Sequence, residues 1–233
     1  MIIVRENIKK KILILFVAVC SIFLAACGNK DLNLNDYLIE ERQNLYVAQD
    51  DVYTASFSSG MREENYNFDG IKNNMVEFGI VTLSRLDCAP MSNDTYTYTV
   101  KINDQTYTGQ LQKSEVDNSY SADIQATAPA DAIVTVQVLF TGYSFNKELV
   151  NTSSQFAVDK DNAIKIANKE LKSNIKQLTS DKNNKIEAVM KIVKDSSTEQ
   201  DRYYWYVGII STNGEMVGVL LDSSNGNVIA KKV

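Results

Sequence analysis

The chain has 233 residues, of which 24 are Lys or Arg and 29 are Asp or Glu, and its formal net charge is −5 at pH 7. It contains no histidine, which excludes histidine metal sites and the Ser-His and Cys-His nucleophile pairs. An acidic chain is also a poor partner for nucleic acid, whose phosphates require Lys and Arg. We therefore expect no nucleic-acid partner, no cofactor and no metal site.

Residues 1–26 have the layout of a secretory signal peptide, with a basic start and an uncharged run. The run has about fifteen residues, fewer than the roughly 20 that cross a membrane as a helix. It ends in Leu24-Ala25-Ala26-Cys27, which resembles the lipobox of bacterial lipoprotein precursors. The resemblance implies cleavage between Ala26 and Cys27 and attachment of diacylglycerol to the Cys27 thiol, which would hold the body outside the cytoplasm on a membrane. An ordinary signal peptide with a chance cysteine is the alternative.

The segment after the cut, residues 27–50, is expected to carry the lipid and act as a tether. Within it, residues 36–48 fit either a brief helix or a strand that packs on the following domain. The chain has three cysteines. Cys20 leaves with the leader and Cys27 is lipidated, so Cys88 has no intramolecular partner. We expect the Cys88 thiol to be buried as a small apolar group.

Residues 51–150 alternate between apolar and polar side chains with the period of two that is typical of β-strands. In the clearest segment, Tyr96, Tyr98, Val100 and Ile102 share one face and polar residues the other, which predicts a half-buried strand. The same pattern predicts strands over residues 52–61, 75–86, 95–102, 106–113, 119–126 and 132–141. Short strands at this spacing predict an all-β antiparallel sandwich of the immunoglobulin-like kind.

Residues 151–158 are interpreted as a linker, after which Asp159 is a good N-cap for a helix. Apolar residues recur at helical spacing on one face of that helix: Ile164, Ala167, Leu171, Ile175 and Leu178. Lysines mark the opposite face, which is either solvated or in contact with phosphate-rich wall polymer or lipid headgroups: Lys165, Lys169, Lys172 and Lys176. Strand patterns follow over residues 185–194, 202–212, 215–222 and 227–232, with Asn213-Gly214 predicting a two-residue type I′ turn. Residues 159–233 are therefore expected to form a small α+β unit, a helix plus an antiparallel meander, as the second of two domains.

This last unit resembles the PepSY domain over about residues 157–233. The resemblance rests on the capped helix start at Asp159, on the strand 203–207, and on Asp222 followed by Gly226 and Val228. It implies an interaction module that restrains a peptidase or protects against one. Because no catalytic domain follows in the sequence, the partner enzyme is expected to be another molecule.

The strand 203–210 is apolar on both faces, yet one helix can cover only one of them. The other face is then covered by the β-rich domain or by a partner, since large exposed apolar patches are rare. Aromatic side chains with polar tips are favoured as interface anchors. The candidate partner-binding residues are Tyr203, Trp205 and Val207.

We expect a non-catalytic, lipid-anchored protein of the bacterial cell envelope whose PepSY-like domain binds, and restrains, an extracytoplasmic peptidase or wall enzyme. A solute-binding or wall-polymer-binding lipoprotein is the first alternative, and a carboxylate-based wall hydrolase is the second. Ser-x-x-Lys occurs at Ser144 and Ser173 without the Lys-Thr-Gly motif that accompanies it in penicillin-recognising enzymes. Acid pairs such as Glu40-Glu41 are adjacent in sequence, which directs their carboxylates apart. These patterns do not favour an enzyme.

Overall fold

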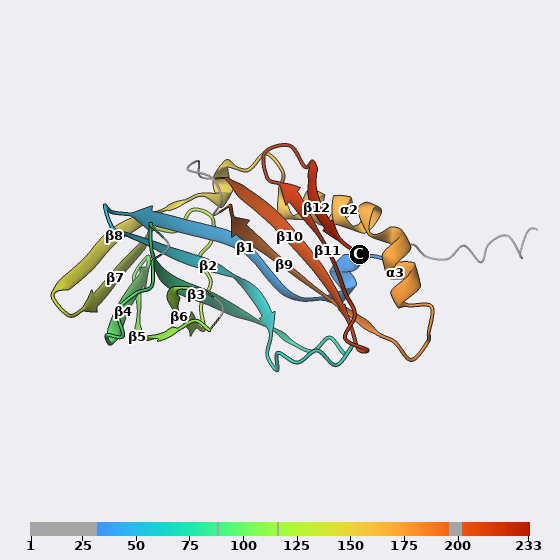
Figure 1. The fold of residues 1–233 in the computed structure, drawn as a ribbon, viewed down its shortest axis with the longest axis horizontal. Helices are drawn as coiled ribbons and strands as arrows, with labels where there is room; N and C mark the ends of the chain where they lie inside the picture. The colour runs from blue at the N-terminus through green and yellow to red at the C-terminus, as the bar shows by residue number, and fades with distance from the viewer. Residues whose placement is uncertain (1–31, 88, 116, 196–201) are drawn as a thin grey trace, which may run out of the picture. The chain divides into compact units, whose positions relative to one another are not determined.

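The computed structural model describes residues 32–87, 89–115, 117–195 and 202–233, and Leu34–Val233 form one compact unit (Figure 1). The predicted leader, its predicted cleavage site at Ala26, the predicted lipidation site Cys27 and the thiol of Cys88 lie outside the described residues. None of the helices in the described ranges has the length and apolar character of a membrane span.

The unit is mostly β, and its strands join into one twelve-stranded sheet. The strands are β1 (Leu38–Gln49), β2 (Tyr53–Glu63), β3 (Met75–Arg85), β4 (Tyr96–Ile102), β5 (Gln105–Lys113), β6 (Ser119–Ile124), β7 (Val134–Phe140), β8 (Tyr143–Asn151), β9 (Ile186–Lys194), β10 (Tyr203–Ser211), β11 (Met216–Asp222) and β12 (Val228–Lys232). The described helical segments are η1 (Leu34–Tyr37), η2 (Ser153–Gln155), α2 (Lys160–Glu170) and α3 (Lys172–Leu178).

Eight of these strands close into an antiparallel barrel in the order β1-β2-β3-β6-β5-β4-β7-β8, and β8 returns to pair with β1. Closure rests on two short seams. The β1–β8 seam has the pairs Tyr46↔Asn151 and Val47↔Val150, and the β5–β6 seam also has two pairs. The predicted immunoglobulin-like sandwich is therefore wrong, because a sandwich leaves the edges of its two sheets unpaired whereas here both seams are hydrogen-bonded.

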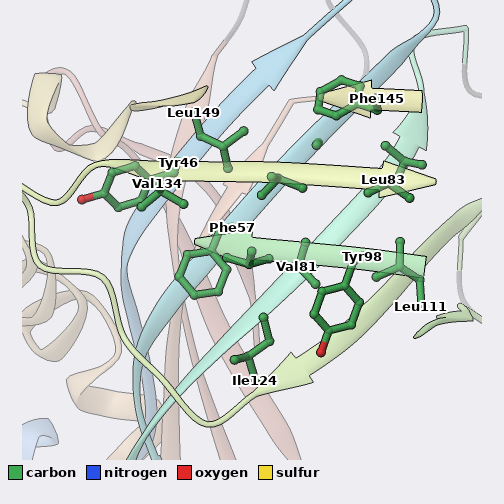
Figure 2. Close-up of a cluster of buried hydrophobic side chains, with 14 of the residues drawn as sticks. Tyr46, Phe57, Val81, Leu83, Tyr98, Leu111, Ile124, Val134, Phe145 and Leu149 are labelled. Carbon is green, nitrogen blue, oxygen red and sulfur yellow. The ribbon is translucent and has the colours of Figure 1, made fainter. Parts of the chain in front are cut away.

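Side chains fill the barrel interior, as the close-up in Figure 2 shows. Phe57 and Val81 are fully buried, and Tyr98 is 6% exposed. Phe57 packs so closely on β3 that a Cβ added to Gly79 would lie 2.3 Å from its ring. Tyr46 donates a hydrogen bond from its hydroxyl to the carbonyl oxygen of Pro129. The interior is thus an apolar core that holds the strands together.

Strand β1 belongs to two parts of the sheet. Its first half pairs in parallel with β9, from Leu38↔Ala188 to Arg42↔Lys191, and its second half closes the barrel. A register shift in the β1–β2 pairing, between Arg42 and Asn44, separates the halves. Beyond β9, the strands β10, β11 and β12 follow in antiparallel order and form, with β9, what we call the outer sheet.

The expected separate PepSY-like α+β unit is wrong as a fold description, because β9–β12 extend the barrel sheet through β1. Residues 27–50 were expected to act as a tether, with a packing strand as one interpretation of residues 36–48. Strand β1 confirms that strand, but its pairing with β9 was not predicted. The brief helix considered for residues 36–48 is also wrong, since β1 covers Leu38–Gln49. The boundaries at residues 50, 151–158 and 159 remain predictions.

Helices α2 and α3 cover one face of the outer sheet (Figure 1). The Asp159 carboxylate accepts the Asn162 N–H at 2.8 Å, so the predicted N-cap is confirmed. The predicted apolar stripe is also confirmed, because each of its five residues is at most 5% exposed: Ile164, Ala167, Leu171, Ile175 and Leu178. The helix is interrupted at Leu171, the residue between α2 and α3.

Candidate functional site

Two of the three candidate partner-binding residues are buried side chains of β10. Trp205 is 2% exposed and Val207 is fully buried. The Trp205 indole N–H donates to the Val158 carbonyl oxygen at 2.8 Å, and its ring meets Phe156 edge-on at 5.8 Å between centroids. Both side chains therefore contribute to packing between the sheet and its cover. Their role in partner binding remains a prediction.

Tyr203, the third candidate, lines a cleft of about 750 Å³. The cleft lies where the ends of β1 and β8 meet the start of β10 and the turn after β11. Its lining residues are Val47, Ala48, Gln49, Val150, Thr152, Gln155, Phe156, Arg202, Tyr203, Tyr204, Asp222, Ser223 and Ser224. The volume is within the range of about 300 to 1,000 Å³ that is typical of ligand sites.

The cleft walls are held by hydrogen bonds between elements that are distant in sequence. The Thr152 N–H donates to the Leu45 carbonyl at 2.8 Å, which ties η2 to β1. The Ser223 hydroxyl donates to the Tyr203 carbonyl at 2.7 Å, and the Val158 N–H donates to the Ser223 carbonyl at 3.0 Å. These bonds fix the aromatic and polar walls relative to each other before any ligand arrives, which lowers the entropic cost of binding.

Aromatic rings form one wall of the cleft. The rings of Phe156 and Tyr203 lie 6.1 Å apart between centroids. The neighbouring Tyr204 hydroxyl donates to the Asp195 carboxylate at 2.9 Å, and this hydrogen bond raises the pKa of Tyr204. The phenol stays neutral at physiological pH, so the wall combines apolar ring faces with a polar tip.

Arg202 and Asp222 bring opposite charges to the cleft. The Asp222 carboxylate accepts hydrogen bonds from the Ser224 hydroxyl at 2.6 Å and the Ser224 N–H at 2.8 Å. The hydroxyl hydrogen bond is the main cause of the lowered pKa of Asp222, to which the Arg202 charge also contributes. Because it is ionised at neutral pH, this carboxylate acts as a hydrogen-bond acceptor and not as a general acid.

Local sequence explains why these groups meet. The turn after β11 places Gly226 at φ 76°, a conformation that favours glycine, and the Gly226 N–H closes the turn on the Asp222 carbonyl at 2.8 Å. Pairing of Tyr204 with Asp222 across β10 and β11 then brings the turn to the start of β10. The sequence reasoning missed Arg202, Asp222 and the η2 residues as site residues. The Asx-type turn Asp222-Ser-Ser opposite an aromatic run was the signal available.

Two buried carboxylates lie away from the cleft. Glu187 on β9 accepts the N–H groups of Gly70 at 2.6 Å and Ile71 at 3.1 Å, and Glu63 on β2 accepts the N–H of Asn73. Burial is the main cause of the raised pKa of Glu187, and the negative charge of Glu63 adds to it. Both carboxylates hold the β2–β3 loop in place.

The adjacent carboxylates of Glu40 and Glu41 point apart, as expected from the sequence. Glu40 forms an ion pair with Arg42 at 2.8 Å, and Glu41 forms one with Lys160 at 3.0 Å, so the two carboxylates have different partners. Within the described ranges, no group of three or more Asp, Glu, His or Cys side chains converges as a metal site would require. Neither observation brings two acids together in the cleft.

Comparisons with protein-family models, with curated proteins and with solved structures found no match to this chain. The protein is described by its own structure: it is a filled antiparallel barrel that carries an outer sheet, with a preformed cleft between the two.

Proposed function

We propose that the chain is a non-catalytic, lipid-anchored binding protein of the bacterial cell envelope, and that its ligand site is the cleft between the barrel and the outer sheet. The ligand is a short exposed segment of another exported protein, such as a peptidase or wall enzyme. The observation that carries the proposal is the cleft itself: a preformed hollow of about 750 Å³ with aromatic and charged walls.

The chemistry of the walls favours a peptide segment over a small apolar ligand. Phe156 and Tyr203 offer ring faces to a side chain, while Arg202 and Asp222 offer opposite charges to the amide and charged groups of a peptide. Gln49 and Gln155 add amides that donate and accept hydrogen bonds. Mixed polar and aromatic walls of this kind are common in protein interfaces.

The alternative of a carboxylate-based hydrolase has less support. The buried acids Glu63 and Glu187 accept backbone hydrogen bonds from the β2–β3 loop and do not line the cleft. Asp222, which does line it, has a lowered pKa. A hydrolase of this type needs one protonated and one ionised carboxyl on either side of the substrate.

The anchor is tested by replacing the lipidated residue. Cys27→Ser removes the thiol that would accept diacylglycerol, so we expect loss of radioactive fatty-acid labelling and of membrane retention. The wild-type chain is the control in the same fractionation. Equal labelling and retention of the variant would contradict the lipoprotein part of the proposal.

The cleft is tested by filling it. Gln155 is exposed on η2 and lines the cleft, whereas Gln110 is exposed on β5 of the barrel and does not. Gln155→Trp should reduce capture of a crosslinked envelope partner at least tenfold, while Gln110→Trp, with the same change in size, should leave it unchanged. Thermal unfolding of both variants checks that the fold is intact. Equal capture by the two variants would contradict the assignment of the cleft.

A further inference from the structure

The face of the outer sheet opposite the helices carries a row of charged and aromatic side chains. Arg42 on β1 is paired with Lys191 on β9, and Lys191 is paired with Tyr206 on β10. Direct cross-strand partners lie on the same face of a sheet. Trp205 and Val207, which alternate with Tyr206, point to the helices, so the row Arg42, Lys191, Tyr206 lies on the other face.

This row contains more positive than negative charge. The Arg42 guanidinium is neutralised by Glu40, with 2.8 Å between Nε and Oε1. Over the residues that the structure describes, no hydrogen bond or ion pair holds the Lys191 ammonium, which lies over the Tyr206 ring at 5.8 Å from its centroid. Burial is the main cause of the lowered pKa of Lys191; the charge of Arg42 lowers this pKa further, and the charge of Glu40 opposes both effects. No carboxylate in the described ranges contacts this half-buried ammonium directly, and such a charge is costly unless a ligand supplies a partner.

A flat aromatic ring lies next to this ammonium. Gly208 and Gly218 face each other across β10 and β11, and the absence of their side chains makes room for Tyr206. The ring lies along the sheet, since a Cβ added to Gly208 would be 2.6 Å from the Tyr206 hydroxyl oxygen and 2.9 Å from a ring carbon. Leu220, the cross-strand partner of Tyr206, flanks the ring. Such a platform suits the apolar CH face of a saccharide ring.

We propose that Lys191 and Tyr206 form a binding site for an acidic saccharide, with the carboxylate on the Lys191 ammonium and the sugar ring on the face of Tyr206. The ion pair with Glu40 offsets the charge of Arg42, so Lys191 supplies the net positive charge at this point. The site lies two residues along β10 from Tyr204, about 7 Å at the usual rise of a strand. It therefore lies on the same sheet face as Tyr204 and Asp222 but does not depend on the cleft being a peptide site.

The test uses the full chain in detergent and three probes in calorimetric titrations: an oligomer of glucuronic acid, a glucose oligomer of the same length, and inorganic phosphate. We expect the acidic oligomer to bind at least tenfold more tightly than either of the others. Equal affinity for the neutral oligomer would overturn the role of the charge. Equal affinity for phosphate would overturn the saccharide assignment and leave only a general oxyanion site.

Two variants locate the binding. Lys191→Met should weaken binding of the acidic oligomer at least tenfold, whereas Lys101→Met, at an exposed lysine of β4, should leave that affinity unchanged. Without ligand, Lys191→Met should melt at the same temperature as the wild type or higher, because an unpaired charge is removed. Unchanged binding by Lys191→Met would overturn the proposal. If that variant fails to fold, Lys191→Arg, which keeps the charge, should fold and retain binding, and loss of binding in a folded Lys191→Arg would count against the proposal.

Tyr206→Leu should weaken binding of the acidic oligomer but not binding of phosphate. Equal loss of both affinities would overturn the role of the Tyr206 ring as a platform for the sugar.

Discussion

The barrel and the outer sheet bury their apolar side chains in different ways. Barrel strands bury one face in a closed interior and leave the other to solvent, so Phe57 and Val81 are fully buried. Outer strands β9–β11 are apolar towards α2 and α3, and on their second face Lys191 and Tyr206 lie among apolar side chains such as Ile210 and Leu220. In the barrel, the inward-facing side chains pack against one another and fill the interior. The outer sheet keeps a second face and, where it meets the barrel, a cleft, and for that reason we propose that binding occurs there.

The largest expected effect comes from a matched pair of core truncations, one in the barrel and one in the outer sheet. Phe57→Ala in the barrel and Trp205→Ala in the outer sheet each remove a large buried aromatic side chain, and each should lower the free energy of unfolding by about 3–5 kcal/mol. Trp205→Ala also leaves the Val158 carbonyl without its indole partner. Denaturant titration with circular dichroism measures both, with the exposed Phe68→Ala as a control expected to cost less than about 0.5 kcal/mol.

Because β1 is shared, the two regions should unfold in one transition. A separate early transition in Trp205→Ala, with the barrel transition unmoved, would show that the outer sheet is an independent unit. That result would favour the two-domain division predicted from the sequence.

The shared strand itself can be disturbed at Gly60. A Cβ added there would lie 1.9 Å from the Glu41 carbonyl oxygen, close to the register shift that separates the two halves of β1. Gly60→Ala should therefore cost about 1–3 kcal/mol, the usual range for overpacking. Gly142→Ala provides a contrast, since its Cβ would meet no atom within 4 Å and only the positive φ of 74° is strained. A smaller loss for Gly60→Ala than for Gly142→Ala would contradict the tight junction.

A smaller effect is expected from Glu187, which ties the β2–β3 loop to the outer sheet. Burial, together with the charges of Glu63 and Asp69, raises its pKa, so the folded state holds the proton more tightly than the unfolded state. Its contribution is therefore favourable at low pH and is lost as the pH rises through the folded pKa. In Glu187→Gln the amide oxygen can still accept the Gly70 and Ile71 N–H groups.

Glu187→Gln should thus be more stable than the wild type at pH 7, and the gain should shrink near the ordinary glutamate pKa of about 4.3. Thermal unfolding at both pH values measures this, and Glu148→Gln at an exposed position of β8 is the control. Lower stability of Glu187→Gln at pH 7 would mean that the ionised carboxylate is the better partner for the loop.

The sequence was sufficient where structure is local. The buried faces of β4 and of the helices were predicted residue by residue, and Tyr96, Tyr98, Val100 and Ile102 are indeed at most 6% exposed. Most strands were predicted to within a few residues, because alternation depends on burial of one face. Strand β8 was not predicted, since most of its residues are exposed and little alternation remains.

Which strands pair with each other is harder to predict from the sequence. A sandwich and a closed barrel share the same alternation, and the difference rests on two-residue seams such as Tyr46↔Asn151 and Val47↔Val150. The predicted type I′ turn at Asn213-Gly214 is also wrong, because Gly214 alone has positive φ there and its N–H bonds to the Ser211 carbonyl. The resulting register pairs Tyr204 with Asp222 and so shapes the cleft. Site residues that meet through such pairings cannot be found from local patterns.

The central claim, that binding belongs to the cleft between the barrel and the outer sheet and not to the barrel wall, is tested most directly by site-specific photo-crosslinking in living cells. A photoreactive amino acid placed at Gln155 in the cleft should give a defined adduct with an envelope protein. The same amino acid at Gln110 on the barrel wall should give none, or adducts at no more than a tenth of that yield. Equal adducts from both positions, or a defined adduct from Gln110 alone, would contradict the claim.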